Sequence, residues 1–292
     1  MNDQQAKWDA KRQHLIEDGY CLVENVLTAA EVAELREITD HLVKQMSEEE
    51  ARRQRSTGSL IPVVEDQRLA QLIAHPKALR ALESMGFRDN RFQSGYIISK
   101  PPQSPPLFWH FDWGFWNHPI SYEPRPLQLF LMYYLTDTTR ANGCLRVIPG
   151  SHLRETPLHK VIAEAHSDDL SSARDLNRVE FHEQPGEIDV MVKAGDLVIG
   201  DSRIMHAAHA NQSDQRRTVV TLWFHPDYQD MPEELQAAFE TRKDALPPGW
   251  TPESLRLLDS VLINYQGQMA PVKFSRVRLS REEAQKRWSQ SA

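Results

Sequence analysis

Between Phe92 and Phe224 the chain is a series of short apolar runs interrupted by Pro, Gly and Asn, and this pattern constrains the fold most strongly. Short strands at such spacing, each bounded by turn signals, are typical of a β-sandwich or a β-barrel. The strands are expected at 92–99, 106–113, 126–136, 144–148, 179–182, 188–192, 197–200 and 217–224.

Helical patterns flank this β-rich core on both sides. Residues 5–20 predict a helix ending at Gly19, and a short strand follows from Tyr20. Thr28, with Glu31 three residues later, predicts a capping box at the start of a second helix that runs to about residue 46. Further helices are expected near 231–243, 252–263 and 281–288.

The sequence contains no internal repeat and no low-complexity linker. We therefore predict a single domain over residues 1–292, made of a helical and strand segment (1–90), a β-barrel core (91–226) and a helical C-terminal segment (227–292). The polar stretch 156–178 is expected to be an inserted helix or loop. The charged stretch 47–58 predicts a solvated helix end or loop, with a lid over a site as the alternative.

Charge and composition exclude several classes of partner. The formal net charge of the 292 residues is -7, so electrostatics do not favour nucleic acid or an anionic membrane. No apolar run approaches the roughly 20 residues of a membrane span, and the N-terminus lacks an apolar signal region. The two cysteines, Cys21 and Cys144, are expected to be buried thiols in a reducing cytoplasm. The sequence leaves open whether the chain is a monomer or a homo-oligomer.

A histidine and an aspartate stand two residues apart on an expected strand, at His110 and Asp112. Residues i and i+2 of a strand project to the same face, so both side chains can bind one metal ion. A second histidine from a distant strand would complete the set of two His and one carboxylate that is typical of Fe(II) oxygenases. His206 follows the apolar run 197–199 and is the candidate, with His209 as its competitor.

Eleven residues beyond His206, Arg217 opens an apolar strand. A guanidinium that faces a barrel interior is unfavourable unless an anion pairs with it, and a carboxylate can do so in a bidentate manner.

These pieces together resemble the phytanoyl-CoA dioxygenase (PhyH) family, with local similarity to ectoine hydroxylase. The resemblance covers roughly residues 10–226 and depends on Trp109-His-x-Asp112, on Asn142-Gly-Cys-Leu-Arg-Val-Ile-Pro-Gly-Ser-His152, on Gly195-Asp, and on His206 followed by Asn211 and Arg217. It implies a mainly β fold with flanking helices, a double-stranded β-helix of the jelly-roll or cupin-like type.

The resemblance also implies an activity. The chain is expected to be a 2-oxoglutarate-dependent non-haem iron dioxygenase that oxidises, and most simply hydroxylates, a small-molecule metabolite. Its cofactors would be Fe(II), 2-oxoglutarate as co-substrate and O2, with succinate and CO2 as by-products. The alternative is a non-catalytic metal- or ligand-binding protein on the same barrel.

Position by position, His110, Asp112 and His206 match the iron ligands of the family. Arg217 matches the residue that anchors the distal carboxylate of 2-oxoglutarate, and Gln93 aligns with a polar residue that contacts the co-substrate or substrate. The chain departs from the family at Ala208, where relatives often have a serine that helps the arginine. Another hydroxyl, such as Tyr96 or Tyr134, is expected to replace it.

Three further residues are candidates for contact with substrate. Trp116 matches a tryptophan that borders the substrate in ectoine hydroxylase, and Trp113 lies in the same aromatic run, whose other possible role is core packing. Arg146 is either an outward-facing charge or a partner for a substrate carboxylate. The remaining histidines without a partner pattern, His118, His159, His166, His182 and His225, are expected to be surface or packed residues.

Overall fold

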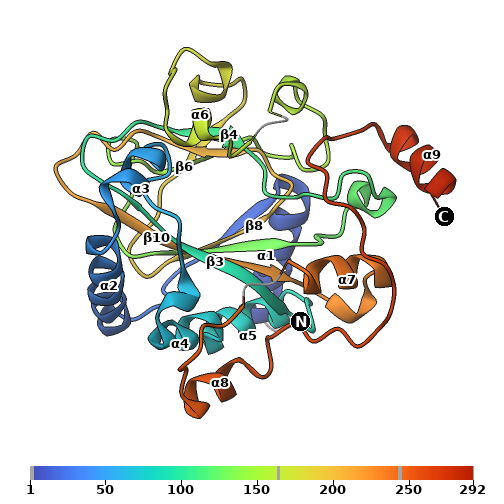
Figure 1. The fold of residues 1–292 in the computed structure, drawn as a ribbon, viewed down its shortest axis with the longest axis horizontal. Coiled ribbons are helices and arrows are strands. Elements are labelled where there is room, and N and C mark those ends of the chain that lie inside the picture. Colours follow the sequence, from blue (N-terminus) through green and yellow to red (C-terminus); the bar gives the residue numbers. More distant parts are fainter. Residues whose placement is uncertain (1–2, 163–164, 243–244, 292) are drawn as a thin grey trace.

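Two antiparallel β-sheets lie at the centre of the molecule (Figure 1). The computed structural model describes residues 3–162, 165–242 and 245–291. The larger sheet has the order β1-β8-β5-β10-β3-β2, with β1 Tyr20–Val23, β8 Leu197–Asp201, β5 Leu129–Tyr134, β10 Arg217–His225, β3 Arg91–Lys100 and β2 Ile61–Pro62. The smaller sheet has the order β4-β9-β6-β7, with β4 Leu107–His110, β9 His206–Ala208, β6 Leu145–Val147 and β7 Ile188–Val190.

Alternation of side chains gives the larger sheet two different faces. In β5 all six residues are buried, yet they divide between two hydrophobic clusters. Leu129, Leu131 and Tyr133 pack toward the helices, whereas Phe130, Met132 and Tyr134 face the other sheet. Because successive strand residues point to opposite faces, one strand supplies both the helix-covered core and the interior between the sheets.

Helices from the N-terminal part of the chain cover the outer face of the larger sheet. Leu15, Val32, Leu72 and Ala78, one residue from each helix, belong to the hydrophobic cluster that includes the outward side chains of β5 and β10. The helices are α1 Asp3–Asp18, α2 Ala29–Lys44, α4 Ala70–Ile73 and α5 Pro76–Ser84.

The predicted capping box at the start of α2 is confirmed. The backbone N–H of Glu31 donates to Thr28 Oγ1 at 3.2 Å, and the backbone N–H of Thr28 donates to Glu31 Oε2 at 2.7 Å. These hydrogen bonds lower the pKa of Glu31 to about 2. A local sequence signal therefore determines where α2 begins.

The remaining helices lie around the smaller sheet and at the C-terminal end (Figure 1). They are α3 Glu48–Arg53, α6 Asp168–Ser171, α7 Glu233–Glu240, α8 Pro252–Leu258 and α9 Arg281–Ser291. Short 3-10 helices occupy Val63–Glu65, Gln67–Leu69, Pro119–Tyr122, Pro157–Lys160, Val179–Phe181 and Tyr228–Asp230.

Seven of the eight strands expected in the core are present, and the differences have simple causes. The segment expected at 179–182 is the 3-10 helix Val179–Phe181 instead, because its length is too short for alternation to distinguish the two forms. The strand expected at 106–113 ends at His110. Strand β9, only three residues long, was not expected from the sequence.

The two cysteines, Cys21 and Cys144, are buried and unpaired, as expected for thiols. Burial raises the pKa of each thiol to about 12. In the described part of the chain, none of the helices combines the length and apolar composition needed to cross a bilayer.

Candidate metal centre and active site

His110 and His206 lie opposite one another on paired strands of the smaller sheet. Strands β4 and β9 are antiparallel, and His110 is the direct cross-strand partner of His206. Their ring centroids are 4.1 Å apart. Asp112 lies just beyond the end of β4, and its backbone N–H donates to the carbonyl of Ser202 at 2.8 Å. The three predicted ligands therefore converge, with one ligand atom from each lying within 4.8 Å of the others.

Backbone hydrogen bonds orient both imidazoles toward the same point. His110 Nδ1 lies 3.0 Å from the carbonyl oxygen of Phe108, and His206 Nδ1 lies 3.1 Å from that of Ile204. Each Nδ1 therefore carries the proton, which leaves Nε2 as the ligand atom. The Nε2 atoms lie 3.6 Å and 3.8 Å from the carboxylate oxygens of Asp112. Burial lowers the pKa of His110 to about 3, so this imidazole is neutral, as a metal ligand must be.

A tryptophan on the larger sheet holds the carboxylate of Asp112. Trp223 Nε1 donates to Asp112 Oδ2 at 2.9 Å. This bond connects β10 to the metal ligands of the smaller sheet. Partners of this kind fix the direction in which a ligand offers its lone pairs.

The Trp223→Phe variant tests the contribution of this hydrogen bond. The substitution removes the indole N–H but retains an aromatic ring in the cavity wall. We expect Fe(II) affinity to fall roughly 10- to 100-fold, measured by anaerobic Fe(II) titration, with an unchanged melting temperature. An Fe(II) affinity equal to that of the wild type would show that Asp112 needs no such support.

One cavity extends from the triad to Arg217. Because β10 alternates, its side chains Arg217, Val219, Thr221 and Trp223 all line cavities at the metal centre, whereas Val220 and Leu222 pack toward the helices. The Arg217 side chain is buried, and its Nε has no hydrogen-bond partner among the described residues. A buried guanidinium with unused donors fits the carboxylate of a bound ligand.

Ala208, which stands where relatives often have a serine, lines the same cavity as Arg217 and offers it no hydroxyl. Tyr134 lines the same cavity, and its hydroxyl donates to the sulfur of Met132 at 3.6 Å. Burial raises the pKa of Tyr134, so its hydroxyl keeps its proton and can donate. Tyr96 lines the neighbouring cavity instead, so Tyr134 is the better of the two predicted replacements.

Lys100, the cross-strand partner of Arg217, and Arg203, in the turn between β8 and β9, are already engaged. Lys100 donates to the carbonyl oxygens of Ser56 at 2.6 Å and Pro105 at 2.5 Å. Arg203 forms an ion pair with Asp201 at 2.6 Å and also donates to backbone carbonyls. Of these three cations, Arg217 is therefore the one that remains available to a ligand.

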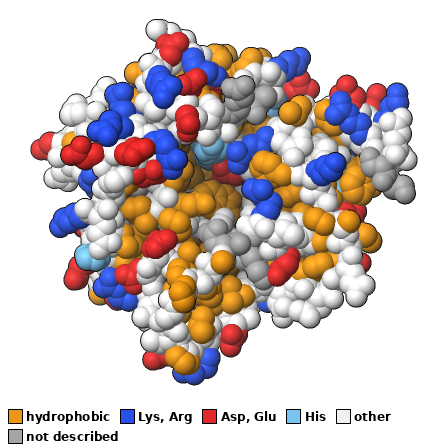
Figure 2. All heavy atoms as spheres, viewed as in Figure 1, with side chains coloured by type: hydrophobic (Ala, Val, Ile, Leu, Met, Phe, Trp, Pro, Cys, Tyr) orange, Lys and Arg blue, Asp and Glu red, His pale blue; other side chains and the backbone are white. Residues whose placement is uncertain are grey.

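A second cavity of about 290 Å³ adjoins the first and shares Asp112, His166 and Trp223 with it. Figure 2 shows basic and histidine side chains at the rim of a central hollow whose walls are largely hydrophobic. Gln93 lies in this cavity and not beside Arg217. Its side-chain oxygen accepts a hydrogen bond from Gln128 Nε2 at 2.6 Å and lies 2.6 Å from His225 Nε2. The structure thus places Gln93 in the second cavity, away from Arg217.

The two tryptophans proposed as substrate contacts are placed elsewhere. Trp113 and Trp116 are 1% and 0% exposed, belong to a hydrophobic cluster, and line neither cavity. Trp113 donates to Ser121 Oγ at 2.9 Å, and the guanidinium of Arg278 covers Trp116 at 4.5 Å. Beyond Asp112 the chain turns away from the sheets, which carries these rings into the core under α7. Their positions favour core packing, the other role that the sequence indicated, and contact with substrate stays a prediction.

We expect Trp116→Ala to destabilise the protein by roughly 3–5 kcal/mol, the usual cost of removing a buried aromatic side chain. The ring packs against Phe111 and Tyr122, with centroid distances of 5.6 Å in each case. Urea unfolding measures the free energy, and Trp116→Phe should lose less because it retains a ring. A variant that melts like the wild type would return Trp116 to the candidates for substrate contact.

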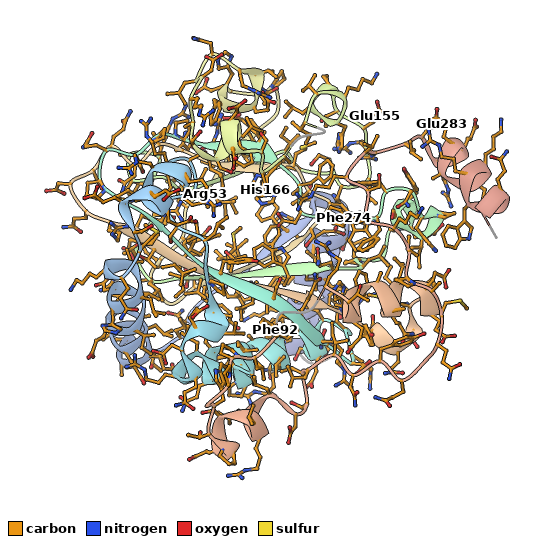
Figure 3. The ribbon with its side chains drawn as sticks, viewed as in Figure 1. Arg53, Phe92, Glu155, His166, Phe274 and Glu283 are labelled. Carbon is orange, nitrogen blue, oxygen red and sulfur yellow. The ribbon has the colours of Figure 1, made fainter. Side chains whose placement is uncertain are left out.

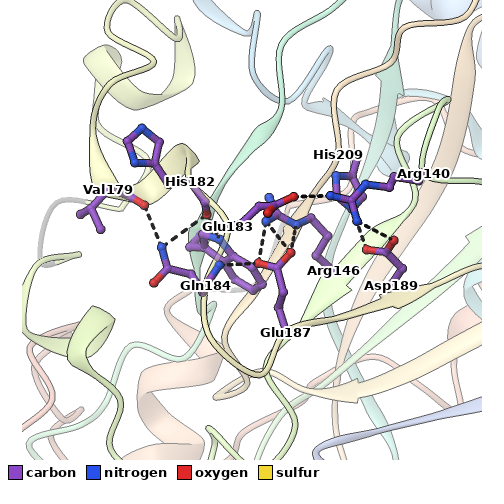
Figure 4. A network of polar contacts seen from close by, with 10 residues as sticks. Arg140, Arg146, Val179, His182, Glu183, Gln184, Glu187, Asp189 and His209 are labelled. Atoms are coloured by element: carbon purple, nitrogen blue, oxygen red, sulfur yellow. Dashed lines mark hydrogen bonds and ion pairs between the residues drawn. The ribbon is translucent and has the colours of Figure 1, made fainter.

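Arg146 and His209 belong to a separate polar network on the smaller sheet (Figure 4). Arg146 forms a bidentate ion pair with Glu187, with both Nη2–O distances at 2.6 Å, and lies over the ring of Trp109. His209 Nε2 lies 2.6 Å from Asp189 Oδ1. Arg146 already has a carboxylate partner in the protein, Glu187, so its role as a substrate contact stays a prediction that the ion pair does not favour. His209 faces away from the triad, which favours His206 as the ligand.

Several residues of the centre were missed or misjudged from the sequence. His166, expected to be an ordinary histidine, lines both cavities, and its ring centroid is 4.8 Å from that of His110. Figure 3 shows His166 beneath α6, near the central hollow. Thr57, at the end of the charged stretch 47–58, lines the Arg217 cavity. That stretch thus contributes to the cover of the site, although its helix α3 is largely exposed.

Two arginines of the C-terminal segment, Arg242 and Arg276, also line the second cavity. Neither has a local motif that marks it. Both residues lie outside the charged surface helices, and nothing else in the sequence distinguishes them from other arginines.

Comparison with known proteins is consistent with this geometry. The family model for phytanoyl-CoA dioxygenase (PhyH) matches residues 15–219. A probable alpha-ketoglutarate-dependent hypophosphite dioxygenase of Stutzerimonas stutzeri is 23% identical over 230 residues, which cover 73% of this chain and 77% of the relative. An ectoine dioxygenase of Bordetella parapertussis is 26% identical over 217 residues, covering 70% of each chain.

Solved structures confirm the predicted jelly-roll fold. The alpha ketoglutarate dependent epimerase SnoN from nogalamycin biosynthesis superposes with a TM-score of 0.56 at 21% identity, covering 75% of this chain and 83% of SnoN. EctD from S. alaskensis, solved with 2-oxoglutarate and 5-hydroxyectoine, gives a TM-score of 0.53 at 20% identity, covering 77% and 78%. The family model spans most of the chain, including His110, Asp112 and His206, and the protein belongs to the phytanoyl-CoA dioxygenase (PhyH) family.

Proposed function

We propose that this protein is an Fe(II)- and 2-oxoglutarate-dependent dioxygenase that hydroxylates a small-molecule metabolite. Membership of the family supports the reaction class. The observation that carries the proposal is the convergence of His110, Asp112 and His206 beside a buried, unpaired Arg217. The relatives named for hypophosphite and for ectoine act on small molecules, which supports a substrate of that kind.

The residues present fit both groups. His110, Asp112 and His206 would hold Fe(II) on one face, which leaves positions for a chelating 2-oxo acid and for O2. Arg217 would anchor the distal carboxylate of 2-oxoglutarate, and Tyr134 would donate a second hydrogen bond in place of the serine missing at Ala208. When bound, iron with 2-oxoglutarate and O2 supplies the oxidising power, releasing succinate and CO2 as the substrate C–H bond becomes C–OH.

The protein itself contributes orientation and exclusion of water. Apolar side chains line the cavity between the triad and Arg217, among them Ile98, Leu107, Met132, Leu145 and Val219. The Trp223 hydrogen bond fixes the carboxylate of Asp112, and the amides of Gln93 and Gln128 offer polar contacts to the substrate in the second cavity.

We also propose that residues 1–292 form one oxygenase domain. Strand β1 of the N-terminal segment pairs with β8 of the core, and Arg242 and Arg276 of the C-terminal segment line the cavity at the triad. Each of the three segments thus contributes to one sheet or to one site.

Release of succinate from 2-oxoglutarate tests the function against the alternative of a non-catalytic binding protein. We expect Fe(II)-dependent succinate formation that increases when an extract of small metabolites is added. Mass spectrometry should then find a product heavier by one oxygen atom. Failure to form succinate with and without metabolites, in protein that binds Fe(II), would favour the binding protein.

A further inference from the structure

Two guanidinium groups converge on the second cavity from the C-terminal segment. Arg242 and Arg276 line the cavity together with Asp112, and both guanidinium carbons lie over the ring of Phe274, at 4.0 Å and 5.2 Å. Figure 3 shows Phe274 at the side of the central region, across from His166. Although the chain has a formal net charge of -7, these two arginines concentrate positive charge beside its metal centre.

The fold holds Arg276 in this place through backbone pairing. The backbone N–H of Ser275 donates to the carbonyl of Gly114 at 2.7 Å, and that of Trp116 donates to the carbonyl of Ser275 at 3.2 Å. A Cβ on Gly114 would lie 1.8 Å from the ring of Phe274, so this close approach requires glycine. The segment that follows the metal ligand Asp112 thus positions the C-terminal segment against the cavity.

Arg242 is placed by α7, whose buried face is anchored in the core. Phe239 is 0% exposed and stacks on His225 with a centroid distance of 3.6 Å. The backbone N–H of Arg242 donates to the carbonyl of Phe239 at 3.2 Å, which continues the helix by one turn. The side chain of Arg242 then extends over Phe274 toward the cavity.

Among the described residues, neither guanidinium has a carboxylate partner. Across 3–162, 165–242 and 245–291, no carboxylate lies within ion-pair distance of Arg242 or Arg276. The Nε of Arg276 is buried without a hydrogen-bond partner, and its Nη1 reaches only the carbonyl oxygen of Ala165, at 3.5 Å. Burial lowers the pKa of Arg276, the charge of Asp112 raises it, and the charge of Arg242 lowers it. Two partly desolvated cations that repel one another are favourable only if an anion binds between them.

We infer that Arg242 and Arg276 form an anion subsite, and that the substrate is a small molecule carrying a carboxylate or phosphoryl group. Among the described residues that line this cavity, Asp112 is the carboxylate, and it is assigned to the metal, so we assign the anion to a ligand. With its charged group between the arginines, the remainder of the molecule would extend toward Asp112, along Trp223 and the amides of Gln93 and Gln128. A cavity of about 290 Å³ suits a small metabolite. The inference rests on the proposed function, because it assigns the substrate class of that same site.

Binding of matched acids and amides tests the subsite. The probes are hexanoate, hexylphosphonate and the neutral hexanamide, titrated by calorimetry into anaerobic full-length protein with saturating Fe(II) and 2-oxoglutarate. Saturation with 2-oxoglutarate occupies the Arg217 cavity, so the probes report on the second cavity alone. We expect at least one anion to bind ten-fold or more tightly than hexanamide, and the two anions together show whether carboxylate or phosphoryl oxygen is preferred.

Variants identify the residues responsible. We expect the double variant Arg242→Gln/Arg276→Gln to lose the preference for anions, and Arg276→Lys to retain part of it. Arg281→Gln is the matched control, because Arg281 lies in the same segment but is exposed and paired with Glu123. Equal binding of acid and amide by the wild type, or an undiminished preference in the double variant, would overturn the inference.

The same samples separate this inference from the proposed function. The charge-transfer band of the Fe(II)–2-oxoglutarate complex reports whether the metal centre assembles. A wild-type protein without this band contradicts the proposed function, whereas a normal band without preference for anions contradicts only the anion subsite. Because calorimetry does not depend on the band, the preference for anions is measured in both cases.

Discussion

His206→Ala is expected to abolish Fe(II) binding, whereas His209→Ala should retain nearly all of it. His206 lies directly opposite His110 on paired strands, with its Nε2 3.8 Å from Asp112. His209 instead forms a hydrogen bond with Asp189 in a separate network. Loss of one of three protein ligands leaves too few donors to hold the ion.

Anaerobic titration with Fe(II) in the presence of 2-oxoglutarate distinguishes the two variants, through the metal-to-ligand charge-transfer band. Thermal unfolding of both variants without metal is the control, because each substitution removes a buried imidazole. A band that persists in His206→Ala and disappears in His209→Ala would exchange their assigned roles.

Arg217→Leu should weaken 2-oxoglutarate binding by about two to three orders of magnitude. Removing one partner of a buried ion pair costs about 3–5 kcal/mol, and every 1.4 kcal/mol is about ten-fold in affinity. The neighbouring cation Lys100 cannot substitute, since it donates to the carbonyl oxygens of Ser56 and Pro105. The dissociation constant follows from titrating 2-oxoglutarate into the Fe(II)-loaded protein.

The same variant should behave differently in the ligand-free protein. Arg217 is buried and has no carboxylate partner in the described part of the chain, so replacing it with leucine should leave the free energy of unfolding unchanged or raise it. Saturating 2-oxoglutarate should stabilise the wild type but not Arg217→Leu. Unaltered 2-oxoglutarate affinity in a folded Arg217→Leu protein would place the anchor elsewhere, and Arg217→Lys shows how much of the effect requires the guanidinium fork.

The parts of this protein that the sequence determined are those governed by local chemistry. The capping box of Thr28 and Glu31 fixes the start of α2 because both partners lie within one turn. The two-residue period of β10 directs Arg217 and Trp223 to the cavities and Leu222 to the helices, whatever the neighbouring strands are. The spacing of His110 and Asp112 likewise indicates a shared site before any partner strand is known.

The tertiary structure decided which distant residues meet. Pairing of β4 with β9 places His206 opposite His110, although β9 is too short to show any period of its own. Arg146 and Arg217 are both buried arginines on strands, but among the residues that the structure describes only Arg146 meets a carboxylate, Glu187. The aromatic run after Asp112 is core because the chain turns under α7 there, and no pattern in the run itself specifies that turn.

The substrate side of the site depends most on tertiary structure. His166 lies beside the metal ligand His110 and comes from a loop near α6. Arg276 lines the cavity from a C-terminal segment whose Ser275 forms a backbone hydrogen bond with Gly114. Such contacts join residues more than fifty positions apart. They consist of backbone hydrogen bonds and ring packing, which many different sequences can form, so no local pattern predicts them. Local sequence therefore determines the secondary structure and the ligand spacing, whereas long-range packing selects which cations lie without partners in the cavity.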